Sequence, residues 1–166
     1  MNYIDFFRDA LKLGLTLGVG PGSTAQTIES AWGSEFIEDV HKRGRMKRRD
    51  YGLVEFSFRK DVEWICTGFI IQAHRLATHG NSIVPASVSS IYGEFPKAIS
   101  FHTLADALQG SGVRLEEEES SGSGFDTYAV PGTGNHLYVT QGDADAVHEG
   151  HNPGEVWSIS VQKLDI

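Results

Sequence analysis

The sequence has few of the residues and patterns that restrict a chain to a disulfide-rich, zinc-binding or membrane class. Cys66 is the one cysteine among 166 residues, which excludes an intramolecular disulfide framework and any zinc site built from several cysteines. No apolar run reaches the roughly 18 residues that a membrane-spanning helix needs. The first apolar stretch is interrupted by Asp5, Arg8, Asp9 and Lys12, a poor pattern for a signal peptide. We therefore expect a cytoplasmic protein without a membrane segment.

Common catalytic signatures are also missing. There is no G-x-S-x-G or H-E-x-x-H motif. Gly20–Ala25 fits G-x-G-x-x-A, but it follows a predicted helix, whereas a dinucleotide site needs a buried strand before the loop. Cys66 lies in the most apolar stretch, and His74 is eight residues further along the same predicted strand, roughly 26 Å away. We therefore expect Cys66 to pack in the core and the glycine loop to connect two helices.

Charge is distributed unevenly along the chain. Residues 1–83 carry 11 Lys/Arg and 10 Asp/Glu, a net charge of +1, whereas residues 84–166 carry 3 and 12, a net charge of −9. The acidic half contains two clusters of carboxylates, which are Glu116, Glu117, Glu118, Glu119, Asp143, Asp145 and Glu149. An acidic surface favours a basic partner through steering and complementarity, although net charge also serves solubility alone. We predict that these seven carboxylates bind a partner protein.

A basic run lies in the first half of the chain. Six of the eight residues 42–49 are Lys or Arg, interrupted by Gly44 and Met46. Such a run supplies phosphate contacts, but no aromatic residue within it offers a base a stacking surface. The acidic overall balance also differs from that of a nucleic-acid-binding protein. We therefore expect an exposed loop or a charged edge strand, and no nucleic-acid partner.

A histidine pair near the C-terminus raises the question of a metal site. His148 and His151 are three residues apart and close to acidic residues, and imidazole with carboxylate suits zinc and related ions. Residues 142–154, however, contain three glycines and a proline and show no helical period that would orient the two rings. We expect a solvated polar loop, no bound metal and no cofactor.

Hydrophobic periodicity predicts an α+β fold in a single domain over residues 1–166, with N-terminal helices followed by a largely antiparallel sheet. A first helix starts after Asn2, and a second starts at Ser23, with Gln26 completing a capping box, and ends at Gly33. Residues 51–58 and 62–74 read as a central antiparallel hairpin. Residues 35–41 have an ambiguous pattern that allows a short helical turn. The other predicted elements are helices at 85–92 and after His102 or Thr103, and C-terminal strands at 113–117, 125–130, 136–140 and around Val156–Val161.

Residues 14–76 resemble a pattern found in small bacterial immunity proteins of polymorphic toxin systems. The resemblance is carried by Leu15-Thr16-Leu17-Gly18, by Ala31-Trp32-Gly33, by the segment Arg48-Arg49-Asp50-Tyr51-Gly52-Leu53-Val54-Glu55-Phe56-Ser57-Phe58, and by Trp64-Ile65-Cys66. In that pattern a glycine-rich loop and a capped helix precede a Tyr-Gly-Leu strand and a hairpin. It assigns no functional residues, because these families bind through variable surfaces.

The resemblance implies a cytoplasmic, non-catalytic inhibitor that occludes the active site of a cognate toxin domain. An acidic surface suits a nuclease toxin, whose substrate cleft is basic. Two other classes stay open from the residues alone. One is an enzyme of unknown chemistry, metal-dependent or not, that uses the His- and Asp-rich region 136–155. The other is a structural or regulatory interaction domain.

Overall fold

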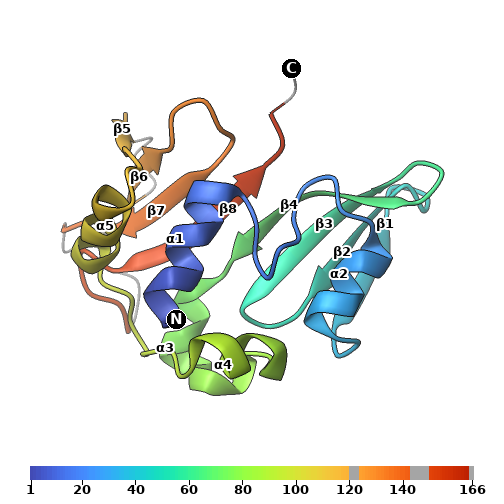
Figure 1. Cartoon of the computed structure of the whole chain (residues 1–166), viewed down its shortest axis with the longest axis horizontal. Coiled ribbons are helices and arrows are strands. Elements are labelled where there is room, and N and C mark those ends of the chain that lie inside the picture. Colours follow the sequence, from blue (N-terminus) through green and yellow to red (C-terminus); the bar gives the residue numbers. More distant parts are fainter. Residues whose placement is uncertain (120–123, 143–149, 165–166) are drawn as a thin grey trace.

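The part of the chain that the structure describes forms an eight-stranded antiparallel sheet with helices packed on one face. The computed structural model describes residues 1–119, 124–142 and 150–164. Helices α1, α2, α4 and α5 lie on the same side of the sheet (Figure 1). The elements are α1 (Tyr3–Leu13), α2 (Ala25–Trp32), β1 (Ile37–His41), β2 (Met46–Asp50), β3 (Val54–Lys60), β4 (Trp64–Ile71), η1 (Ala73–Arg75), α3 (Leu76–His79), η2 (Gly80–Ile83), α4 (Ala86–Tyr92), α5 (Phe101–Gly110), β5 (Glu116–Glu118), β6 (Phe125–Ala129), β7 (His136–Thr140) and β8 (Val156–Gln162). This architecture confirms the predicted α+β class.

Each half of the chain builds one half of the sheet. The strand order is β1-β2-β3-β4-β8-β7-β6-β5, so the first four strands form one half and the last four form the other. The two halves meet where β4 pairs with β8, from Gly68 opposite Gln162 to Ile71 opposite Ile159. The two halves of the chain differ in net charge. Because each half forms one half of the sheet (Figure 1), the two ends of the sheet also differ in charge.

Two glycines allow other backbone segments to approach β8. A Cβ atom on Gly68 would lie 2.5 Å from the carbonyl oxygen of Val161, and one on Gly134 would lie 2.3 Å from that of Gln162. Cβ atoms essentially never approach other atoms so closely, so a side chain at either position would force the backbone to shift. The close packing of backbone around β8 therefore depends on glycine in its neighbour β4 and in the turn before β7.

The predicted central hairpin is present as β3 and β4. Val54, Phe56 and Phe58 point into the core and are fully buried, as their alternation with polar residues predicts. Phe56 packs against an aromatic cluster that joins the sheet to α2, with ring centroids 5.3 Å from Trp32 and 5.6 Å from Phe69. Since β4 lies fourth in the order of eight strands, the hairpin stands at the centre of the sheet, as predicted.

The ends of α1 are held by local and long-range hydrogen bonds. Asn2 caps the N-terminus, as predicted, and with Asp5 forms a capping box. At the other end Gly14 adopts φ +66°, which suits glycine. The buried side chain of Asn135 donates a hydrogen bond of 3.0 Å to the carbonyl of Leu11. This last contact ties α1 to the β6–β7 turn across most of the sequence.

Several local predictions are wrong. Residues 37–41 form strand β1 rather than a helical turn, because the acidic residues Glu38 and Asp39 stand opposite Arg49 and Arg48 of β2. The second helix is capped by Thr24 instead of Ser23.

The boundaries of later elements also differ from the prediction. The N-cap of α5 is Ser100, two or three residues before the predicted cap at His102 or Thr103. β4 ends at Ile71, and the chain then enters a 3-10 turn. In the part of the chain that the structure describes, no helix is long and apolar enough to cross a bilayer.

We expect Phe56→Ala to lower the free energy of unfolding by about 3–5 kcal/mol, because it removes a fully buried ring and leaves a cavity. Val62→Ala is the control, since Val62 is 90% exposed and should change stability by less than about 0.5 kcal/mol. Denaturant unfolding measures both variants. A loss below about 1 kcal/mol for Phe56→Ala would contradict the assigned core face.

We expect Gly68→Ala to destabilise the protein by about 1–3 kcal/mol, because its Cβ would press against the backbone of β8. Gly110→Ala serves as the matched control: no atom lies within 4 Å of its Cβ, so stability should stay the same or rise by up to about 1 kcal/mol. Thermal unfolding of both variants and the wild type measures these changes in stability. Equal stability would show that the β4–β8 junction tolerates a side chain.

Candidate protein-binding surface

The predicted acidic run forms the last strand of the sheet. Glu116, Glu117 and Glu118 make up β5, and all three, with the following Glu119, are exposed. Because β5 pairs only with β6 among the described residues, its other edge is free. Charged side chains on such an edge deter pairing with another copy of the same strand.

The four glutamates do not form one patch, because side chains of a strand point alternately to the two faces of the sheet. Glu118 lies on the face without helices, where its carboxylate is 3.4 Å from Nε2 of His136. Glu116, on that same face, pairs with Arg114. Glu117 points to the helical face, toward Tyr128. Burial, and then the charges of Glu117 and Asp126, raise the pKa of Tyr128.

Three of the predicted partner-binding residues stand outside the described residues. These are Asp143, Asp145 and Glu149. His148, of the predicted histidine pair, also lies outside the described residues. His151 is described: its largely buried ring packs edge-on against Trp157 with centroids 4.9 Å apart, and its Nδ1 lies 3.4 Å from a carboxylate oxygen of Glu155. Within the described ranges no three His, Cys, Asp or Glu side chains are grouped as metal ligands.

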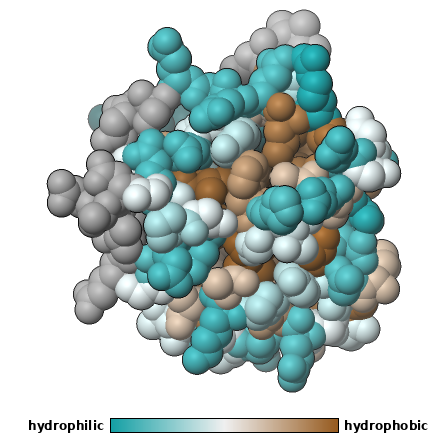
Figure 2. Space-filling view, turned by 90° about the vertical axis from the view of Figure 1, so that its left-hand side faces the viewer, coloured by the Kyte–Doolittle hydropathy of each residue, from teal (hydrophilic) through white to brown (hydrophobic). Residues whose placement is uncertain are grey.

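A groove lies between α5 and β5, with a volume of about 600 Å³. The sequence analysis did not predict it, because its walls come from a helix, a loop and two strands. Its lining residues are Phe101, Ala105, Gln109, Gly112, Val113, Arg114, Leu115, Glu117 and Tyr128. Phe101 and Tyr128 stack with ring centroids 4.6 Å apart. Figure 2, which faces this end of the molecule, shows apolar surface framed by hydrophilic side chains. We call this feature the α5–β5 groove.

Exposed cations gather at the other end of the sheet, where the β1–β2 and β3–β4 turns lie. They are Lys42, Arg43, Arg45, Arg59 and Lys60, and none of the five pairs with a carboxylate within the described part of the chain. They surround a hollow of about 850 Å³. We call this group the basic tip. The predicted exposed, charged loop is therefore present at residues 42–45.

The rest of the basic run is buried, which the sequence analysis did not predict. The side chains of Lys47 and Arg49 point to the helical face and are only 6% and 10% exposed. One oxygen of Glu38 forms a 3.3 Å ion pair with Lys47 and accepts a 2.7 Å hydrogen bond from Arg49. Arg49 also donates a hydrogen bond to the carbonyl of Ala25. These contacts fasten β1 and β2 to the start of α2.

Aromatic rings line this buried pair as well. The Nζ atom of Lys47 lies 4.6 Å from the ring centroid of Trp64, and the guanidinium of Arg49 lies 4.3 Å from that of Phe36. Burial, and then the charge of Arg49, lower the pKa of Lys47. Burial alone would raise the pKa of Glu38, but the hydrogen bond from Arg49 and the charge of Lys47 bring this pKa below its ordinary value.

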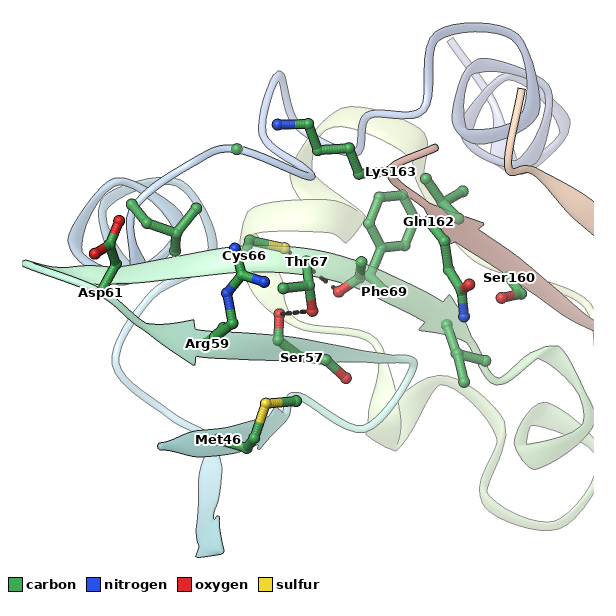
Figure 3. Close-up of a pocket in the computed structure, with 15 residues that line it drawn as sticks. Met46, Ser57, Arg59, Asp61, Cys66, Thr67, Phe69, Ser160, Gln162 and Lys163 are labelled. Carbon is green, nitrogen blue, oxygen red and sulfur yellow. Dashed lines mark hydrogen bonds between the residues drawn. The ribbon is translucent and has the colours of Figure 1, made fainter. Parts of the chain in front are cut away.

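The bare face of the sheet carries a shallow groove of about 610 Å³ where β8 ends beside β4 (Figure 3). Ser57, Thr67 and Ser160 supply hydroxyl groups to it, and Arg59 and Lys163 supply positive charge. Thr67 donates a hydrogen bond to the carbonyl of Ser57. No histidine lines this groove among the described residues, so its hydroxyl groups have no imidazole base beside them.

Ser57 also begins an S-x-x-K sequence that ends at Lys60, which the sequence analysis overlooked. In the catalytic form of this motif the serine and lysine must act together. Here they lie three residues apart on a strand, so their side chains point to opposite faces. The structure thus separates the two groups that this motif would need to combine.

Cys66 packs in the core, as predicted, and is 1% exposed. Burial raises the pKa of its thiol to about 12. The thiol donates a hydrogen bond to the carbonyl of Gly68. A neutral, buried thiol is a poor nucleophile. His74 lies beyond the end of β4, where its ring stacks on Trp157 with centroids 4.2 Å apart.

No protein-family model matches this chain, and neither a curated protein nor a solved structure shows significant similarity to it. These comparisons therefore give no guide to the interpretation of its surfaces.

We expect Cys66 in the native protein to react with a disulfide reagent at pH 8 at least 100-fold more slowly than in the unfolded chain. The folded thiol is buried and its pKa is raised to about 12, so far less thiolate forms. Absorbance at the reagent's product wavelength gives both rates. Rates within a factor of ten would show that the thiol is accessible.

The same raised pKa has a consequence for stability. The folded state disfavours the thiolate, so this contribution to stability is complete below pH of about 9 and is lost as the pH rises toward about 12.

Proposed function

We propose that this protein is a non-catalytic inhibitor of the immunity class, which binds a cognate toxin domain in the cytoplasm of the cell that makes both. The observation that carries the proposal is the exposed acidic edge strand β5 beside an apolar groove. Apolar surface with a charged rim is the usual composition of a protein interface. The resemblance of residues 14–76 to immunity proteins supports the same function.

The positions of the charges favour a basic partner at the β5 end. The carboxylates of Glu117 and Glu119 have no cationic partner in the described part of the chain. The unpaired cations of the basic tip belong to the opposite half of the sheet. A molecule with separated charges is oriented as it approaches a charged partner, which raises the association rate. A toxin with a basic substrate cleft would thus meet β5 first.

The test begins with co-expression in a sensitive host. Wild-type protein should restore growth of cells that produce the toxin domain encoded beside its gene, and purified protein should bind that domain in a stoichiometric complex. Absence of both rescue and complex formation would refute the inhibitor function.

The contribution of β5 is tested by converting Glu116, Glu117, Glu118 and Glu119 together to glutamine. We expect this variant to associate with the toxin domain at least tenfold more slowly at low salt, with a flatter salt dependence, because steering charges are lost. Stability should change little, since all four side chains are exposed. Stopped-flow fluorescence at two salt concentrations measures the rates.

A matched control has the opposite charge change at the other end of the sheet. Lys42, Arg43, Arg45 and Lys60 are converted to glutamine, which should leave association no slower than in the wild type. Equal rates and equal salt dependence for the wild type and the acidic-run variant would remove β5 from the interface.

A further inference from the structure

We propose that the free edge of β5 and the α5–β5 groove together hold an extended protein segment in which basic and apolar residues alternate. This inference rests on the proposed inhibitor function and specifies how the partner is bound. The segment would add to the sheet as a ninth strand next to β5. Three features of the described residues support it: an unpaired strand edge, an adjoining apolar groove and exposed negative charge on the strand.

The first feature is the backbone of β5. Within the described residues its neighbour is β6 alone, with Glu116 opposite Ala129 and Glu118 opposite Thr127. The N–H and C=O groups on its other side are free to pair with another chain. Extended segments bind such edges through main-chain hydrogen bonds, and pockets for alternate side chains provide specificity.

The second feature is the difference between the two faces beside this edge. Alternate side chains of an added strand would point to opposite faces, as those of β5 do. On the helical face they would lie over the groove, among Phe101, Val113 and Leu115. On the bare face they would lie beside Glu116 and Glu118. Apolar side chains fit the first environment and lysine or arginine fits the second.

The third feature decides between kinds of occupant. A second copy of this chain would place its own β5 glutamates against these, and like charges on paired strands are destabilising. The lysine or arginine side chains of a basic segment would instead lie beside the carboxylates of Glu116 and Glu118 on the bare face, which pair with Arg114 and His136. Charge complementarity therefore favours a partner over a dimer.

The probe is an acetylated eight-residue peptide that alternates lysine with valine and phenylalanine. A scrambled peptide of the same composition tests alternation, and the alternating peptide with every second amide nitrogen methylated tests main-chain pairing. We expect the alternating peptide to bind at least tenfold more tightly than either, by fluorescence anisotropy. Amide exchange of Glu116, Glu117 and Glu118 should slow when it binds. Equal binding of all three peptides would refute the proposal.

Two variants on α5 locate the binding site. Ala105→Arg fills the groove and adds a repelling charge, so it should weaken peptide binding at least tenfold. Thr103→Arg makes the same charge change at an exposed position of α5 outside the groove and should change binding less than twofold. Equal effects of the two variants would contradict the groove site. A dimer in sedimentation that Ala105→Arg abolishes would make a second copy the occupant and overturn the proposal.

Failure of the groove proposal is distinguishable from failure of the inhibitor function. If Ala105→Arg protects toxin-producing cells as well as the wild type and binds the toxin domain with unchanged affinity, the groove proposal is wrong and the inhibitor function stands. If the alternating peptide binds as expected but the wild type neither rescues growth nor binds the toxin domain, the inhibitor function is wrong and the groove remains a peptide-binding site.

Discussion

The pairing of β4 with β8 is the constraint on which the rest of this structure depends. It joins two sets of four strands that come from different halves of the chain. At this junction the backbone of Gly68 approaches β8 too closely for a side chain, and Gly134 of the β6–β7 turn approaches β8 just as closely. Because β8 also lies under α1, the same strand positions the helix against which α5 packs. The α5–β5 groove therefore depends on a strand that contributes no residue to it.

Charged residues that are neighbours in the sequence lie on opposite faces of the sheet, which a count of charges along the chain does not show. Alternation sends Lys47 and Arg49 to the helical face, where Glu38 and aromatic rings enclose them, and leaves Arg48 exposed on the bare face. Two buried cations that share one carboxylate are costly to desolvate, and they serve to fasten β1 and β2 to α2. The same alternation places Glu117 at the groove and its neighbours on the other face, so a single acidic run presents two surfaces.

The proposed function combines features that are individually ordinary. A charged edge strand by itself is a device against aggregation, and a partly apolar groove by itself is common on protein surfaces. At the β5 end the two adjoin, and the carboxylates there are only partly paired, whereas the acidic residues of the opposite edge strand β1 are matched by the cations of β2. This contrast between the two edges distinguishes a surface suited to a basic partner from a surface that is internally neutralised.

The sequence by itself determined the class of fold and much of its framework. Strict alternation in Val54–Phe58, the Asn2 cap and the paired C-terminal strands each depend on neighbouring residues, and the structure confirms them. Strand β1 was missed, because its stability comes from opposite charges on β2 and not from its own pattern. Burial of Lys47 and Arg49, the split of the acidic run between two faces and the existence of the groove were decided only by tertiary structure. Each of these three features requires segments that are far apart in the sequence to meet. Hydrophobic periodicity and charge counts could not predict them, because both describe only residues that are close along the chain.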